Sequence, residues 1–269
     1  MHNLTHKINL FGAQINPLTM LETVAQIQCW LVEQDKKCYN VITPNVDHIV
    51  KLQTDAQLKL AYEKAALVVT DGKPVRWAAK LLGELIPETV PGSDLVPAIF
   101  NNAQSNNIPL TVFLLGAMPG VADRAKIMIE QKWPAVSVTG TLSPDFGFEK
   151  NPQTCQDICD IINKSRSQLL VVGLGAPKQE IWVTKYAPLL QVNVALCVGA
   201  TIDFIAGEKA RAPKWLQNIG LEWLHRMLTE PRRLAKRYFH DALIFPGLIA
   251  KEWVLRNALN KSKKSTIIK

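Results

Sequence analysis

The sequence predicts an α/β protein in which helices flank a mostly parallel, Rossmann-like sheet. Short apolar segments alternate with segments of helical period over residues 1–207, as in chains whose parallel strands are joined by helices. The composition, with 48% hydrophobic and 20% charged residues among 269, is that of an ordinary globular protein. A basic C-terminal quarter predicts, in addition, a helical appendage over residues 208–269.

The expected strands are short apolar runs that end at small or polar residues. They cover residues 38–44, 66–72, 109–117, 136–142, 168–175 and 192–201. Between them apolar residues recur with the helical period, which predicts helices at residues 19–34, 45–65, 72–83, 93–106, 120–133 and 156–165. The appendage is expected to contain three helices separated near Pro231 and Pro246, because proline removes a backbone donor.

Several classes of protein are disfavoured by composition. Five cysteines at irregular spacing support neither a disulfide framework nor a zinc site, so reduced thiols in a cytosolic setting are expected. The first residues lack the basic end and apolar stretch of a signal peptide, and no apolar run approaches the ~20 residues of a membrane-spanning helix. There is no Asp-x-Asp motif and no His/carboxylate cluster with ligand spacing, so neither a metal nor another cofactor is expected.

Positive charge is concentrated at the C-terminal end of the chain. The net charge is +8, and residues 207–269 contain 14 Lys and Arg against 5 Asp and Glu. Aromatic and aliphatic side chains recur there every four residues among the basic ones, at Trp215, Ile219, Trp223 and Met227. This pattern is typical of an interfacial amphipathic helix, and it suggests an anionic partner such as a nucleic acid, a phosphorylated lipid or an anionic membrane surface.

The residues that follow the strands are the candidate site, because ligands of such sheets bind beyond the carboxyl ends of the strands. Asp71, beside Gly72, is either a general base or a turn residue that bonds its own backbone. Thr43 and Asn45 can bind a sugar or phosphate, although Asn45 is equally suited to cap the following helix.

Small residues and polar groups also follow the later strands. A phosphate or a ribose can be bound there by backbone N–H groups, and a base, ribose or sugar edge by polar side chains, with turns and helix caps as the alternative interpretation. The candidates are Gly92, Ser93, Asp94, Gly116, Gly173, Gly175, Lys178, Gln179 and Asp203. In the appendage, a pyrophosphate could be bound by Arg226, Arg233, Lys236 and Arg237, which otherwise form a solvated basic face.

Taken together, several strings resemble the successive motifs of the WecG/TagA/CpsF glycosyltransferases. They are "TPNVDHI", "VTDGKPV", "PETVPGSDL", "LLGA", "VGLGAPKQEIW" and "VGATIDFIAGEKARAPKWLQNIGLEWLHRMLTEPRR", in the family's order and within residues 8–240. The resemblance implies transfer of a sugar, often N-acetylmannosamine or its uronic acid, from a UDP-sugar donor in cell-surface polysaccharide synthesis, with a different hexose or uronic acid as the alternative. The implied acceptor is N-acetylglucosamine linked to a polyprenyl pyrophosphate at the inner face of the cell membrane.

The resemblance also implies roles for individual residues. The family is metal-independent and inverting, and its proposed base corresponds to Asp71, with Thr43 in the same pocket. Gln179 matches the glutamine of its "APKQE" motif, and arginines of the appendage that complete the site match Arg226 and Arg233. The sequence departs from the family at Thr89, where many members have arginine.

Two other functions remain as alternatives from the residues alone. The first is a nicotinamide oxidoreductase, disfavoured because Lys178 stands where the dinucleotide fingerprint needs its third glycine. The second is a nucleic-acid-binding protein, disfavoured because the basic tail lacks a known nucleic-acid module. We therefore expect a cytoplasmic enzyme bound peripherally to the membrane, without nucleic acid as a partner and with a homo-oligomer as a further option.

Overall fold

A single parallel sheet forms the centre of the molecule. The computed structural model describes residues 6–267, with the side chains of 218, 233 and 259–267 excepted. The strand order is β4-β3-β8-β7-β5-β6, and every pair is parallel. These strands are β3 (Tyr39–Ile42), β4 (Leu67–Val68), β5 (Leu110–Gly116), β6 (Val136–Leu142), β7 (Leu169–Gly173) and β8 (Val194–Cys197). The predicted α/β class with a Rossmann-like parallel sheet is confirmed.

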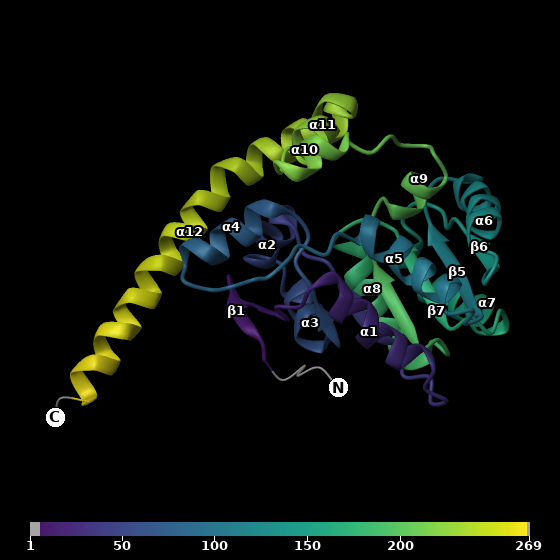
Figure 1. Cartoon of the computed structure of the whole chain (residues 1–269), viewed down its shortest axis with the longest axis horizontal. Helices are drawn as coiled ribbons and strands as arrows, with labels where there is room; N and C mark the ends of the chain where they lie inside the picture. Colours follow the sequence, from purple (N-terminus) through teal and green to yellow (C-terminus); the bar gives the residue numbers. More distant parts are fainter. Residues whose placement is uncertain (1–5, 268–269) are drawn as a thin grey trace.

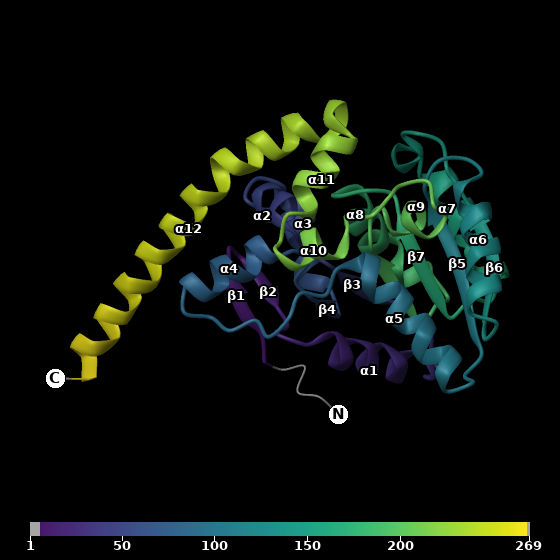
Figure 2. The same cartoon turned by 45° about the horizontal axis from the view of Figure 1, so that its top comes forward.

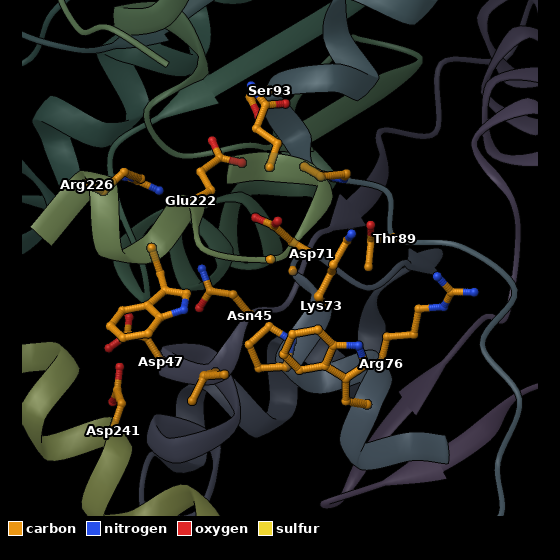
Figure 3. Close-up of a pocket in the computed structure, with 18 of the residues that line it drawn as sticks. Asn45, Asp47, Asp71, Lys73, Arg76, Thr89, Ser93, Glu222, Arg226 and Asp241 are labelled. Atoms are coloured by element: carbon orange, nitrogen blue, oxygen red, sulfur yellow. The ribbon is translucent and has the colours of Figure 1, made fainter. Parts of the chain in front are cut away.

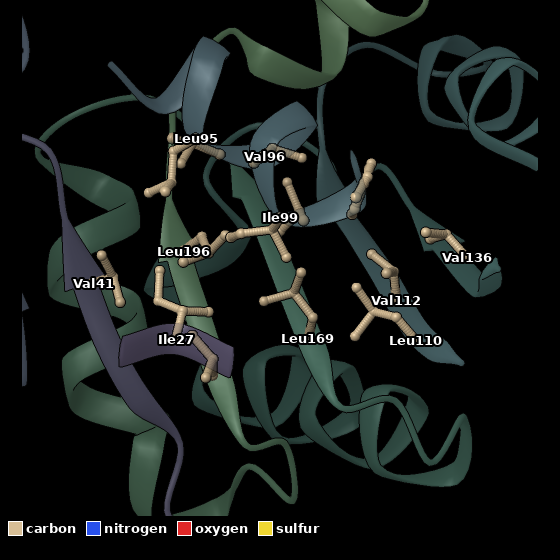
Figure 4. Packing of buried hydrophobic residues seen from close by; sticks show 14 of the residues in the cluster. Ile27, Val41, Leu95, Val96, Ile99, Leu110, Val112, Val136, Leu169 and Leu196 are labelled. Carbon is tan, nitrogen blue, oxygen red and sulfur yellow. The ribbon is translucent and has the colours of Figure 1, made fainter. Parts of the chain in front are cut away.

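Successive strand residues point to opposite faces, so both faces of the sheet are apolar and both are covered. One face carries α1 (Met20–Leu31), α5 (Gly92–Ser105), α6 (Val121–Lys132) and α9 (Thr201–Ile205), whose apolar side chains share a core cluster with Val41, Val112 and Leu196 (Figure 4). The other face carries α7 (Pro152–Lys164) and α8 (Lys178–Tyr186), together with the short helical turns η1 (Phe148–Lys150) and η2 (Ala187–Leu189).

A third cluster lies at the β3–β4 edge of the sheet. It joins the hairpin of β1 (Ile8–Leu10) and β2 (Ala13–Ile15) to α2 (Val46–Leu52), α3 (Ala56–Lys64) and α4 (Lys73–Leu81). The hairpin was not expected, since its strands are too short to produce a sequence signal. The single helix expected at residues 45–65 is also wrong, because Asp55 caps a new helix by accepting from the N–H groups of Gln57 and Leu58.

The C-terminal segment is helical, as predicted, and it returns to the core. It comprises α10 (Lys214–Asn218), α11 (Glu222–Thr229) and the long α12 (Pro231–Ile267), which runs beside α2 and α4 and then past the rest of the molecule (Figures 1 and 2). The predicted helix break near Pro246 is wrong, because this proline lies inside α12. The neighbouring Phe245 is buried against Phe11, with ring centroids 5.5 Å apart, and this packing opposes the cost of the lost hydrogen bond.

Polar contacts fix the far half of α12 to the core. Arg256 pairs with Glu84 at 2.6 Å and with Glu252 on its own helix, and it also donates to the carbonyl of Asn9. Through these contacts and the burial of Phe245, the appendage covers the β3–β4 edge of the sheet. Within the described residues, no helix combines the length and apolarity that crossing a membrane requires.

Candidate functional site

A cavity of about 740 Å³ lies between the β3–β4 edge of the sheet and the C-terminal helices. Its core wall is built by the segments that follow β3 and β4 and by the start of α5, and its outer wall by α11 and α12 (Figure 3). The predicted site residues among its lining are Asn45, Asp71, Gly72, Ser93, Asp94 and Arg226. Residues far apart in the sequence are thus brought together around one space.

Asp71 is held in place by the backbone on both sides of it. Its N–H donates to the carbonyl of Pro44 at 2.8 Å, and the preceding Thr70 accepts from the N–H of Val90 at 2.7 Å. Gly72 follows with φ +89°, a conformation that favours glycine, and α4 begins immediately after it. This turn directs the carboxylate of Asp71 into the cavity (Figure 3).

The electrostatic surroundings of Asp71 suit proton transfer near neutral pH. Its pKa is raised to about 7, chiefly by burial and then by the negative charge of Glu222, while Arg226 acts in the opposite direction. A carboxyl group with this pKa is partly ionised and can accept a proton at pH 7. Asp71 therefore has the position and the acidity of a general base.

Two polar residues that follow β3 have structural partners. The side chain of Asn45 lines the cavity and also caps α2, because its Oδ1 accepts from the N–H of His48 at 3.3 Å. Thr43 is 5% exposed, and its hydroxyl donates to the carbonyl of Cys197 at 3.3 Å, so it ties β3 to β8. Thr43 precedes the lining residue Asn45 by two positions, but among the described residues it does not itself line the cavity.

The start of α5 supplies a second polar wall. Ser93 and Asp94 line the cavity, and the carboxylate of Asp94 is paired with Arg211. Gly92 is buried, and a Cβ there would come within 2.7 Å of the Val198 side chain, so only glycine allows the helix to begin this close to β8. Ser93 and Asp94 therefore line the same space as Asp71, and Arg211 holds the Asp94 carboxylate from outside the described lining.

Basic side chains surround the same space. Lys73, Arg76 and Arg226 line the cavity, and Arg76 also donates to the carbonyls of Ile86 and Pro87. Arg226 stacks over the ring of Phe204 at 5.7 Å, and its Nε has no hydrogen-bond partner among the described residues. An anion that enters beside Asp71 would therefore meet cations from both α4 and α11.

The glycine-rich turns after β5 and β7 lie outside this cavity. Gly116 and Gly173 approach so closely that a Cβ on Gly116 would stand 2.6 Å from the Gly173 carbonyl carbon. Gly175 has φ +82°, and the Lys178 ammonium is paired with Glu149 at 3.1 Å. None of these predicted residues belongs to the described lining, so their binding roles remain predictions.

Gln179 belongs to a buried polar network behind the cavity. It is 2% exposed, its Nε2 donates to Glu180 at 2.6 Å, and its Oε1 accepts from the N–H of Gly199 at 3.2 Å. Glu180 also lies 3.8 Å from His48, which is hydrogen-bonded to Tyr62 at 2.9 Å. The network connects α2, α3 and α8, and its polar groups position these helices rather than line the cavity.

Three of the remaining predicted residues, Asp203, Lys236 and Arg237, are not part of the described lining of the cavity. Asp203 is 8% exposed and lies 3.6 Å from Lys209. Arg237 lies 3.8 Å from Asp47 and stacks on Tyr238, and Lys236 is exposed on α12. The side chain of Arg233 lies outside the described residues, so the structure does not place that predicted contact.

The cavity also contains residues that the sequence interpretation missed. They are Asp47, Lys73, Arg76, Trp77, Glu88, Gln217, Glu222, Trp223, Tyr238 and Asp241. Lys73 could have been found, because it directly follows Asp71 and Gly72. The carboxylates of α11 and α12 gave no signal, because only the fold brings them opposite the strand ends. Thr89, the position that departs from the family pattern, is part of the lining as well.

Among the residues that the structure describes, no group of three or more His, Cys, Asp or Glu side chains is arranged to hold a metal ion. What the arrangement offers is the partly ionised carboxylate of Asp71 in a space that cations, hydroxyl groups and further carboxylates also line and that the appendage partly encloses. Such a site can accept a proton from a hydroxyl group while it stabilises negative charge nearby.

Comparisons with known proteins identify the chain's relatives. The model of the "Glycosyl transferase WecG/TagA/CpsF family" matches residues 8–259. The chain is 27% identical over 235 residues to proteins of two Staphylococcus aureus strains, NCTC 8325 / PS 47 and COL, each named "N-acetylglucosaminyldiphosphoundecaprenol N-acetyl-beta-D-mannosaminyltransferase". Each match covers 86% of this chain and 88% of the relative. The family match spans the core, the cavity and most of the appendage, and the chain therefore belongs to the WecG/TagA/CpsF family of glycosyltransferases.

Proposed function

We propose that this glycosyltransferase moves N-acetylmannosamine, or a closely related sugar, from a UDP-sugar to N-acetylglucosamine linked to a polyprenyl diphosphate. The observation that carries the proposal is Asp71, a carboxylate with a pKa near 7 that faces a cavity shared by the core and the appendage. The names of the Staphylococcus aureus relatives supply the sugar and the acceptor. The family membership disfavours both the oxidoreductase and the nucleic-acid-binding alternative.

The proposed reaction is a single displacement with inversion at the anomeric carbon. Asp71 accepts the proton of an acceptor hydroxyl as that oxygen attacks the anomeric carbon of the donor sugar. The bond between this carbon and the diphosphate oxygen breaks, and UDP leaves with the electron pair. Lys73 and Arg226 line the same cavity and can stabilise the charge that develops on the diphosphate.

The acceptor is a lipid, and the C-terminal helices have the composition to meet it at a membrane surface. Large apolar side chains are exposed on them, including Trp215, Leu228, Phe239 and Leu243, between 63% and 71% exposed. Lys and Arg residues near an anionic surface are worth about 1 kcal/mol each. We propose that residues 208–269 act as a membrane-binding unit at the inner face of the membrane, next to a transferase core of residues 1–207. A homo-oligomer stays a prediction.

The proposal is tested by a donor screen. Purified full-length protein is incubated with a set of UDP-sugars and a short-chain polyprenyl diphosphate carrying N-acetylglucosamine, and the product masses are measured. We expect a mass increase of one N-acetylhexosamine with UDP-N-acetylmannosamine, together with release of UDP. Transfer of another hexose or a uronic acid would replace the proposed donor, and the absence of transfer from every UDP-sugar would contradict the proposal.

A further inference from the structure

A second pocket lies on the C-terminal helices next to the cavity. Its volume is about 530 Å³, and we call it the apolar pocket. It is lined by Trp223, Met227, Ala235, Lys236, Tyr238, Phe239 and Ala242. Apart from the Lys236 ammonium, the Tyr238 hydroxyl and the Trp223 indole N–H, this lining consists of apolar side chains. No carboxylate and no arginine belongs to it among the described residues.

The apolar pocket and the cavity are neighbours that share a wall. Trp223, Tyr238 and Ala242 line both spaces. The rings of Trp223 and Tyr238 meet edge to face, with centroids 6.0 Å apart and an interplanar angle of 81°. One of these rings comes from α11 and the other from α12. A molecule with a polar head in the cavity and an apolar chain attached to it can therefore extend past this aromatic pair.

The cavity has a charged and polar lining and the apolar pocket a mainly apolar one. A lipid-linked sugar likewise has a polar end, the sugar and diphosphate, and an apolar end, the hydrocarbon chain. The cavity offers Asp71, Lys73 and Arg226 to a sugar and a diphosphate, whereas the neighbouring lining offers apolar surface. In a polyprenyl diphosphate the apolar chain begins at the phosphate itself. A diphosphate held near Arg226 would consequently place the first carbons of the chain near Trp223, on the same helix.

We propose that the apolar pocket binds the first isoprene units of the polyprenyl diphosphate acceptor. The proposal rests on the proposed function and adds a subsite to it. Burial of CH₂ and methyl groups against the aromatic and aliphatic lining supplies the affinity. Lys236 contributes its methylene chain to the lining and keeps its ammonium in water, close to the negative surface from which the lipid emerges. An acyl chain of a bilayer lipid is the competing occupant.

Acceptor chain length provides the test. Ala235 lines only the apolar pocket, so Ala235→Phe places an aromatic ring at this pocket without altering the residues that line the cavity. Ala250→Phe is the matched control, because Ala250 is exposed on the same helix and lies outside both linings. Full-length wild type and both variants are assayed in solution with two acceptors that carry the same diphosphate-linked sugar, one with a single isoprene unit and one with three.

The measured quantity is the ratio of kcat/KM for the longer acceptor to that for the shorter one. We expect a ratio of about 10 or more for wild type and Ala250→Phe, since burial of two additional CH₂ groups already suffices for this gain. For Ala235→Phe we expect a ratio near 1. Equal ratios for all three proteins would overturn the proposal. So would an unchanged ratio combined with weaker binding of Ala235→Phe to liposomes of anionic phospholipid, the result expected for an acyl-chain site.

A second measurement does not depend on turnover. A three-isoprene diphosphate that carries a benzophenone at the end of its chain is irradiated with the full-length protein, and the labelled peptides are mapped. We expect labels within residues 223–242, reduced at least fivefold by Ala235→Phe and unchanged by Ala250→Phe. Labels confined to other peptides would overturn the subsite. Labelling of this segment in a protein that transfers no sugar would contradict only the proposed function.

Discussion

At the scale of the residue, Asp71 combines a functional position with a cost in stability. Its carboxyl follows β4 directly, and burial together with the nearby charge of Glu222 raises its pKa to about 7. A group whose pKa is raised by folding stabilises the folded state fully only below its unfolded pKa, near 4. That contribution is lost as the pH rises through 7. At neutral pH part of the Asp71 carboxyl groups are therefore ionised in a partly buried position, which lowers the stability of the fold.

The first prediction concerns the activity of Asp71. We expect the transfer rate of the wild type to rise about tenfold per pH unit up to pH 7 and then to level off, because only the ionised carboxylate accepts a proton. Asp71→Asn should lower kcat by at least about 100-fold at pH 8. Initial rates with the donor and acceptor identified by the screen measure both effects. Near-normal turnover of Asp71→Asn would remove this residue from the role of base.

The same substitution has a predicted effect on stability. Asn occupies the space of Asp without a charge, so Asp71→Asn should unfold at a higher temperature than wild type at pH 8 and at an equal temperature at pH 4. The expected increase is about 2–4 °C for each kcal/mol gained. Thermal unfolding followed by circular dichroism at the two pH values provides the measurement. A lower melting temperature at pH 8 would show that the Asp71 carboxylate is stabilised by its surroundings.

The sequence predicted some of these residues and missed others for a physical reason. Asp71 was predicted as a candidate because it directly follows an expected parallel strand. Residues in that position lie at the carboxyl ends of the strands, where ligands of such sheets bind. Asp241 and Glu222 were missed because they lie on helices whose docking depends on the packing of the whole chain. Gln179 is polar and close to a strand end, yet its hydrogen bonds run to Glu180 and Gly199 instead of into the cavity.

At the scale of the element, the contact of α12 with α2 brings two carboxylates together. Asp241 is 4% exposed, and its Oδ2 has no hydrogen-bond partner among the described residues. Burial first, and then the negative charge of Asp47, raise the pKa of Asp241 to about 6, while the charges of Arg237, His240 and Lys51 act in the opposite direction. Asp47 is itself bonded to Lys51 at 2.8 Å. Docking of α12 therefore favours the protonated form of Asp241.

This pair predicts a pH-dependent helix contact. A carboxyl whose pKa is raised by docking stabilises the docked helix below pH 4, and this contribution is lost as the pH rises through 6. Asp241→Asn should remove most of this dependence and increase the protection of residues 236–250 at pH 8. Hydrogen exchange, corrected for the intrinsic effect of pH, measures the protection. Asp157→Asn, at an exposed position of α7, is the control, and equal protection in both variants would contradict the prediction.

Pro246 illustrates how packing overrides a local signal. A proline inside a helix costs about 3 kcal/mol, which is why the sequence predicts a break. In the structure α12 continues through it, because Phe245 is buried in the cluster formed by the hairpin, α2 and α4. Pro246 itself lines the cavity. The side chains around this proline thus belong both to the packing of the appendage and to the candidate site.

At the scale of the whole molecule, the appendage completes both the cavity and a core cluster. It supplies Glu222, Trp223, Arg226 and Tyr238 to the cavity and Phe245 to the cluster at the β3–β4 edge. The large sheet and the clusters on its two faces consist of residues 1–207 alone. Binding and chemistry are therefore expected to depend on the appendage more strongly than folding does.

Deletion of residues 208–269 tests this division. We expect the truncated protein to keep its parallel sheet, with a melting temperature lowered by about 5 °C or more because Phe11 and its neighbours become exposed. Transfer to the lipid-linked acceptor should be lost, because the outer wall of the cavity is missing. Circular dichroism and the product-mass assay measure these two outcomes, with Arg256→Ala as a full-length control that loosens only the far half of α12. Full activity of the truncated protein would contradict the proposed role of the appendage.

The sequence by itself determined the class of the fold, the place of Asp71 directly after an expected strand and the separation of a near-neutral core from a basic C-terminal segment. These properties depend on local patterns of apolar, small and charged residues, which the chain carries in order. Only the tertiary structure decided which side chains share the cavity and how their pKa values change. Burial and charge interactions add up over residues as distant in sequence as Asp47, Asp71, Glu222 and Asp241, and these residues come close together only once α11 and α12 have packed against the core.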